Sequence, residues 1–380
     1  MKEFKRIFRV FLSVLFLIQL VRPICAFAAS PNDDGLVEVT ETDAINLAQD
    51  FFDEVFPVEV NADTPEKLYK SDGQATGYVV NALRNGSPHG YVIYDFSKNW
   101  CISRFSFDEG ASFPSTNSRV AFKNLDNTRL VALDSLSFAS IDSSGNGMNL
   151  GTGEHVYLEN AANTWSGIDI TTGRSSDPTK FEQVLTNHAT LYKQGYTVTS
   201  ANAISGYSNP TELTVEQYTN RYACAVSSMY TMCSYYLPMG GMSDLNKSYI
   251  ELWNLSNTQI QKVERGITFG TTNDRNQPKA ITEFCSNRGK TVNVTFTPYP
   301  SWDQFKNCID NKQIAQFGAT LRSNQSGHAM ATVGYMTLKN TRTGGNMQTL
   351  MVCDGWYPEI AILPYDITPY VYHSGIFCNG

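Results

Sequence analysis

Hydrophobic residues near the start of the chain follow a helical pattern. Between Ile45 and Val55, apolar residues recur at every third or fourth position, which is the spacing of one helix face. Thr40, followed three residues later by Asp43, has the arrangement of a capping box. We therefore expect a helix over residues 40–56.

Short runs of alternating, β-rich sequence come next. Residues 77–83 and 90–96 are separated by the turn sequence Asn-Gly-Ser-Pro, which predicts a β-hairpin. Residues 100–107 continue the pattern and are expected to extend the sheet.

The first half of the chain is expected to end near residue 200. A second helical pattern covers residues 180–195 and stops at Gly195. Residues 196–213 are polar, poor in charge and without periodicity. Such a segment predicts an exposed linker, the kind that proteases cut. Two domains are also what a chain of 380 residues favours.

The second half places helices first and strands afterwards. A helix is expected from Cys224 to Leu237, because its apolar residues share one face and Pro238 follows. Further helices are expected over residues 245–255, 277–289 and 301–311. Strands are expected over residues 291–299, 313–322, 328–338, 347–357 and 360–366. This segregation of helices from an antiparallel sheet indicates the α+β class.

The first 28 residues have the order of a secretory signal peptide. A basic opening is followed by an apolar run over residues 10–21 and by the small residues Ala26 and Ala28. The run is too short to span a bilayer comfortably, and no later run reaches the length needed. We expect cleavage near Ala28, no stable membrane anchor, and a protein that is extracellular or associated with the cell wall.

Charge and cysteine content indicate which kinds of partner and ligand the protein is expected to bind. The net charge is −7, and loss of the signal would make it more negative because that segment holds five Lys/Arg and one Glu. No basic stripe is present, so no nucleic-acid partner is expected. Seven cysteines follow the signal, and an odd number outside the cell predicts at least one free thiol. The sequence has no CxxC pair or His/Cys cluster, so neither a metal nor a cofactor is expected.

Cys224 is the candidate nucleophile. A reactive cysteine needs a lowered pKa, and the start of a helix supplies partial positive charge and free N–H groups. Cys224 stands where the helical pattern begins, whereas Cys233 lies more than two turns later on the apolar face. Cys233 is therefore expected to be a packing residue, and the same role is the alternative for Cys224.

His328 and Asp354 are the candidate partners of Cys224. His328 follows a polar lead-in and begins a strand, so its ring can be held rigidly at a cleft and act as a general base. Asp354 ends the next β-rich run, where it could orient the imidazole. The alternatives are a surface histidine and an aspartate that caps a turn with Gly355. His373 is the rival base in the second half.

An acyl-transfer site also needs donors for the oxyanion. The backbone N–H of Cys224 is one candidate. The side-chain amide of Gln217, seven residues upstream, is the second, with Asn220 as its alternative.

These motifs resemble those of the papain-like cysteine peptidases. The likeness is closest to compact, secreted bacterial members, including streptopain-type enzymes and relatives of the peptidases that cut double-glycine leaders. In that group a helix begins with the nucleophilic Cys, a GHA…VGY strand carries the base, and the following strand ends in Asp or Asn before Gly-Trp. Here the corresponding sequences are YACAVSS, GHAMATVGY and VCDGWY, within residues 210–380.

The resemblance implies a zymogen. Residues 206–380 would form a papain-like peptidase domain, and residues 29–205 would form a small α+β propeptide that covers the cleft, as in streptopain-like precursors. The implied activity is hydrolysis of protein or peptide substrates through a triad of Cys224, His328 and Asp354. Two alternatives remain open: a cell-wall peptide amidase with the same chemistry, and a catalytically inactive secreted binding module.

Overall fold

The computed structural model of the chain describes residues 37–96, 98, 100–114, 128–158, 168–169, 174–175, 185–186, 195–239 and 241–379. The expected signal peptide lies outside these residues. Most of the helix expected over residues 180–195 also lies outside them. Of that segment, only Leu185–Thr186 and Gly195 are described, and Leu185–Thr186 form the short strand β13. Glu38–Gly380 belong to one compact unit, within which we call the part up to residue 205 the first half.

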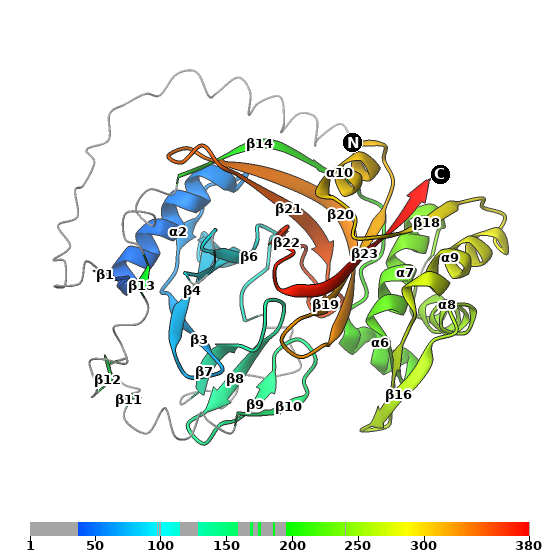
Figure 1. Ribbon diagram of the computed structural model, residues 1–380, viewed down its shortest axis with the longest axis horizontal. Coiled ribbons are helices and arrows are strands. Elements are labelled where there is room, and N and C mark those ends of the chain that lie inside the picture. The colour runs from blue at the N-terminus through cyan, green and yellow to red at the C-terminus, as the bar shows by residue number, and fades with distance from the viewer. Residues whose placement is uncertain are drawn as a thin grey trace. The chain divides into compact units, whose positions relative to one another are not determined.

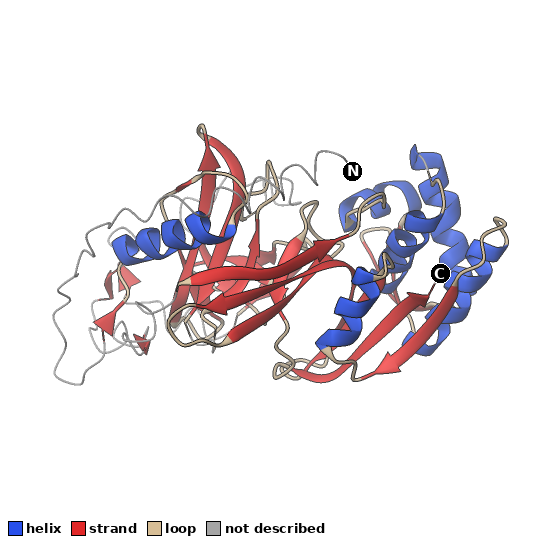
Figure 2. Ribbon diagram, turned by 90° about the horizontal axis from the view of Figure 1, so that it is seen from above, coloured by secondary structure: helices blue, strands red, loops and turns tan. Residues whose placement is uncertain are grey.

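The described residues combine α-helices with one large sheet (Figure 1). The helices are α2 (Glu41–Val55), α6 (Glu212–Thr219), α7 (Cys224–Tyr236), α8 (Gly241–Leu255), α9 (Gln277–Ser286) and α10 (Trp302–Asp310). Helices α6 to α9 gather together (Figure 2), whereas α2 lies apart from them and packs against β2, β4 and β14.

Strands of both halves form a single mixed sheet. Its order is β10 (His155–Tyr157), β9 (Asn146–Asn149), β8 (Phe138–Asp142), β7 (Thr128–Ala132), β3 (Glu66–Lys70), β4 (Ala75–Arg84), β5 (Ser87–Asp95), β6 (Ile102–Ser106), β22 (Ala361–Pro364), β21 (Asn346–Cys353), β20 (Gly327–Asn340), β19 (Ala315–Leu321), β23 (Tyr370–Asn379) and β18 (Asn293–Pro298). In addition, β2 (Asn61–Ala62) pairs with β4, and β14 (Tyr196–Ala203) pairs with β20. A separate sheet joins β15 (Arg221–Tyr222), β17 (Ile267–Thr271) and β16 (Gln259–Glu264).

The strongest sequence patterns are confirmed. Helix α2 begins after Thr40, whose side chain forms the predicted capping box with Asp43. Strands β4 and β5 form the expected hairpin, and Asn85 and Gly86 at its turn both have positive φ, as a type I′ turn requires. The helices and strands expected in the second half are also present, with boundaries shifted by a few residues.

The segment expected to be an exposed linker is in part a strand. Tyr196–Ala203 form β14, which pairs with Gly334–Asn340 of β20. Tyr196 is buried, but most of the following residues face solvent, because β14 lies along one edge of β20. A polar edge strand has little hydrophobic alternation, so its sequence looks like that of a loop. Ser205 and Gly206, just beyond β14, are exposed.

The two halves meet through backbone pairing and a common core. Phe105 of β6 pairs with Ile362 of β22, and β14 pairs with β20. The main hydrophobic core contains Phe51 and Phe52 of α2 together with buried residues of α7, α8 and β20. The expected division near residue 205 therefore crosses a packed interface.

Candidate active site

Cys224 is the first residue of α7, as the sequence predicts. The preceding residue, Ala223, is extended (φ −150°) and has no side chain that caps the helix. The Tyr249 hydroxyl instead accepts a hydrogen bond from the Ala223 N–H (2.8 Å) and donates to its carbonyl oxygen (3.0 Å). Tyr249 is fully buried on α8, so it fixes the backbone at the point where the helix begins.

The Cys224 thiol lies beside the strand that carries His328. Its Sγ accepts hydrogen bonds from the N–H groups of Ala329 and Ala225. Burial is nevertheless the largest influence and raises the pKa of Cys224 to about 11, with smaller upward contributions from Glu212 and Asp274. In this state of the protein the thiol is protonated at neutral pH.

His328 is held against the main chain of Asp354. Its Nε2 lies 2.8 Å from the carbonyl oxygen of Asp354. Because a carbonyl oxygen only accepts, Nε2 carries the proton and Nδ1 is the free basic nitrogen of the neutral ring. Burial lowers the pKa of His328, and Asp354 opposes that shift. The imidazole is therefore neutral in this arrangement, which is the form required of a general base.

Trp356 covers the imidazole. The two rings are stacked, with centroids 3.9 Å apart and an interplanar angle of 17°. Gly151 of the first half packs directly against the indole of Trp356. A Cβ added at Gly151 would lie only 3.0 Å from the indole, so a larger residue does not fit there without a shift. The indole is thus enclosed between the candidate base and a loop of the first half.

The Asp354 carboxylate does not make the contact with the imidazole that the sequence predicts. Its Oδ1 accepts the N–H groups of Trp356 (2.9 Å) and Tyr357 (3.0 Å), which closes a turn through Gly355 at φ +77°. Its Oδ2 forms an ion pair with Nη1 of Arg104, at 2.8 Å. Hence the carboxylate caps the turn at Gly355, which is the alternative role considered for Asp354, and the carbonyl oxygen of Asp354 contacts His328.

The candidate oxyanion side chains are exposed, unlike the buried side chains of His328 and Asp354. Gln217 is exposed on α6, and Asn220 is an exposed residue that ends α6 in the left-handed conformation (φ 52°). His373, the rival base, is buried on β23, with its ring against Tyr299 and Phe317. Cys233 is fully buried within α7, as expected of a packing residue.

Arg104 and Tyr249 are site residues that the sequence pattern did not single out. Arg104 is a charged residue within an otherwise uncharged strand. Because a charged side chain in such a strand is rarely buried without a partner, Arg104 could have been identified as a candidate for a buried ion pair. Tyr249 shares its helix with other apolar residues, so its sequence position carried no signal.

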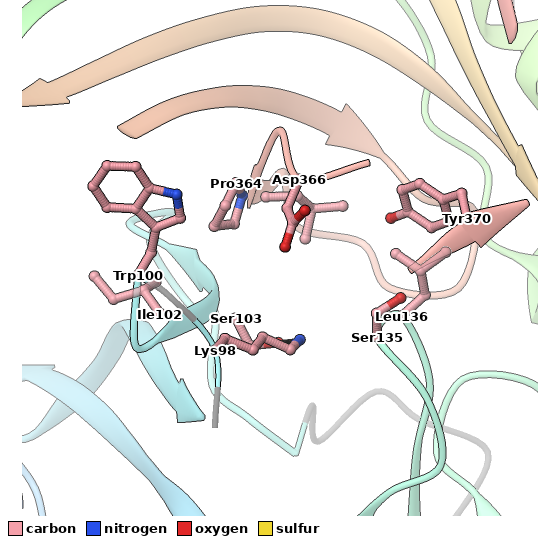
Figure 3. Close-up of a pocket in the computed structure, with 10 residues that line it drawn as sticks. Lys98, Trp100, Ile102, Ser103, Ser135, Leu136, Pro364, Asp366 and Tyr370 are labelled. Atoms are coloured by element: carbon pink, nitrogen blue, oxygen red, sulfur yellow. Dashed lines mark hydrogen bonds between the residues drawn. The ribbon is translucent and has the colours of Figure 1, made fainter. Parts of the chain in front are cut away.

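A small cavity lies elsewhere, where the two halves meet (Figure 3). Its volume is about 30 Å³, and its lining residues are Lys98, Trp100, Ile102, Ser103, Ser135, Leu136, Leu363, Pro364, Asp366 and Tyr370. The Lys98 ammonium donates to the Ser103 hydroxyl (2.8 Å) and lies 3.8 Å from Asp95. Neither Cys224 nor His328 lines this cavity, so it is separate from the candidate active site.

Among the described residues, no three His, Cys, Asp or Glu side chains gather into a group that could hold a metal ion. Within the same residues, no helix combines the length and hydrophobicity of a membrane span.

No protein-family model matches the chain, and no curated protein matches it. Among solved structures, the chain is similar to the Pseudomonas avirulence protein AvrPphB at 10% sequence identity and a TM-score of 0.21. The match covers 45% of this chain and 96% of that one. A likeness this weak carries no argument about function.

Proposed function

We propose that this protein is a secreted cysteine peptidase that is made as a zymogen, with Cys224 as nucleophile and His328 as general base. The observation that carries the proposal is the contact at the start of α7, where the Cys224 thiol accepts the N–H of Ala329, the residue next to His328. Nucleophilic catalysis needs a thiol and an oriented base in the same site, and here the thiol at a helix start contacts the strand that carries the oriented imidazole.

The chemistry follows from these positions. Nδ1 of His328 takes the thiol proton, and the thiolate attacks the carbonyl carbon of a peptide bond. The N–H of Cys224 stabilises the oxyanion, and Gln217 is the candidate second donor. His328 then returns the proton to the leaving amine, and water hydrolyses the thioester. Asp354 orients the imidazole throughout.

Contacts from the first half support latency of the precursor. Gly151 packs on Trp356, beside the candidate base. The carbonyl oxygen of Gly153 accepts a hydrogen bond from Arg265 (3.3 Å), and Glu154 pairs with Lys262. Arg265 and Lys262 belong to the β16–β17 hairpin, and β15, the third strand of that small sheet, ends at Tyr222, two residues before Cys224. A loop of the first half thus contacts both Trp356 and the β16–β17 hairpin.

Removal of the first half is therefore the expected activation step. Among residues 195–213, Ser205 and Gly206 are exposed and lie outside β14. A protease, or a second copy of the enzyme, can reach this bond without first opening the sheet.

The test compares the wild-type precursor with Cys224→Ala and with the matched control Cys233→Ala, which changes a buried cysteine of the same helix. We expect wild type and Cys233→Ala to trim themselves between residues 195 and 213 and to hydrolyse casein, and Cys224→Ala to do neither. Mass spectrometry locates the cut, and peptidoglycan is offered as a second substrate.

Each outcome has a meaning. Release of peptides from peptidoglycan but not from casein would favour the cell-wall amidase. If Cys224→Ala behaved like wild type, Cys224 would be a core thiol, and the inactive binding module would replace the peptidase. A precursor that is fully active while uncut would remove the zymogen from the proposal.

A further inference from the structure

A buried ion pair joins the two halves at the candidate active site. Nη1 of Arg104, on β6, lies 2.8 Å from Oδ2 of Asp354, and the two side chains are 4% and 2% exposed. A guanidinium keeps its charge at any pH that a protein survives. Because both charges are buried, removing either partner would leave the other charge unpaired away from water, which is strongly destabilising.

Neighbouring groups fix the guanidinium in place. Its Nε donates to the Tyr91 hydroxyl (2.7 Å), which in turn donates to Oε1 of Glu359 (3.3 Å). Its Nη2 lies 3.8 Å from the same Glu359 oxygen, and the ring of Tyr357 lies 4.8 Å from Cζ. Tyr91 belongs to the first half and Glu359 to the second, so the network is assembled only while both halves are together.

In this network, the carbonyl oxygen of Asp354 contacts His328 and the carboxylate does not. With Oδ1 capping the turn and Oδ2 facing Arg104, the imidazole contacts the carbonyl oxygen. A carboxylate beside an imidazole favours the imidazolium form far more than a neutral carbonyl does. An imidazolium is also the partner that a catalytic thiolate needs.

We propose that Arg104 is a positioning residue that holds the Asp354 carboxylate away from His328 for as long as the first half is attached. The inference rests on the proposed peptidase function and adds its means of regulation. When the first half leaves, Oδ2 loses its cation and accepts the Nε2–H of His328. The imidazolium–thiolate pair then gains a direct hydrogen bond to the carboxylate, in place of the contact with the carbonyl oxygen that the precursor has.

The experiment measures how fast iodoacetamide alkylates Cys224 in the full-length chain, by peptide mass spectrometry across a pH series. The variant is Arg104→Gln, and Arg104→Lys is the conservative replacement that keeps the positive charge. The matched control is Arg129→Gln, which also removes a buried arginine of the first half but one that stacks on Tyr69 (5.1 Å to the ring centroid).

Arg104→Gln is expected to alkylate about tenfold faster near neutral pH, which corresponds to a fall of one unit in the thiol pKa. Its pH profile shifts to lower pH by the same amount. Arg104→Lys and Arg129→Gln stay close to wild type. After the first half is removed, enzymes derived from wild type and Arg104→Gln have the same sequence and must share one kcat/KM.

Two results would overturn the inference: alkylation of folded Arg104→Gln at the wild-type rate or slower, and an equal acceleration in Arg129→Gln, which would indicate general loosening. Should Arg104→Gln fail to fold, Tyr91→Phe takes its place, because it removes the hydroxyl that orients Nε and leaves the charge. Failure of the peptidase proposal itself looks different, since the trimmed wild-type protein would then be inactive as well.

Discussion

Gly151→Ala tests whether the first half is fitted to the candidate active site. A Cβ at this position would lie 3.0 Å from Cγ and Cδ2 of Trp356 and 3.2 Å from its Cβ. The indole cannot retreat easily, because it is already stacked on His328 at 3.9 Å. The loop is also tied down, since the N–H groups of Gly151 and Thr152 both bond to Oδ1 of Asn149. Overpacking of this kind costs about 1–3 kcal/mol.

The measurement is urea unfolding of the precursor in the Cys224→Ala background, which prevents self-cleavage. Gly345→Ala is the matched control, because its added Cβ would meet another indole, that of Trp100, at an ordinary 3.4 Å. We expect Gly151→Ala to lower the free energy of unfolding by an amount in the stated range, and Gly345→Ala to leave it nearly unchanged. Equal effects for the two variants would refute the tight fit at Trp356.

Three further predictions concern stability. Tyr357→Ala should cost about 3–5 kcal/mol, because the ring is 1% exposed among first-half residues, whereas Tyr299→Ala, at a site 62% exposed, should change the urea midpoint little. Burial raises the pKa of Glu359 to about 7, so between pH 4.5 and 7 the folded protein holds a proton that the unfolded chain has lost. Wild-type stability should then fall as pH rises through this window, by up to about 3 kcal/mol, and thermal melts of Glu359→Gln should lack this slope. Thr40→Ala should cost about 1 kcal/mol in a thermal melt, through loss of the α2 cap, whereas Thr64→Ala, at an exposed site outside the helices, should not.

The elements that carry the candidate site could be predicted from local sequence. Helix α7 begins at Cys224 because its apolar pattern begins there, and β20 starts at Gly327, one residue before the expected His328. Both depend on short-range periodicity, which a single sequence records. The contact between α7 and β20 depends on tertiary packing, but the order of the Cys224, His328 and Asp354 motifs along the chain suggests it.

The role of Asp354 could not be predicted in the same way. An Asp-Gly pair after a strand is equally typical of a capped turn and of a partner for histidine. The structure uses the carboxylate for the turn and the main-chain oxygen for His328, and the choice depends on Arg104, 250 residues earlier in the chain. No local pattern records such a pairing.

Strand β20 is the longest strand among the described residues, and its two ends have different neighbours. Residues Gly327–Thr332 pair with β19 and include His328, whereas Gly334–Asn340 pair with β14. A cut after Ala203 would release β14 and leave a row of unpaired backbone N–H and C=O groups along β20. Such an open edge can add a strand from another molecule, whether a second copy or an extended polypeptide. A cut before Tyr196 would retain β14 and keep this edge closed, so the position of one cleavage also sets the tendency of the processed protein to self-associate.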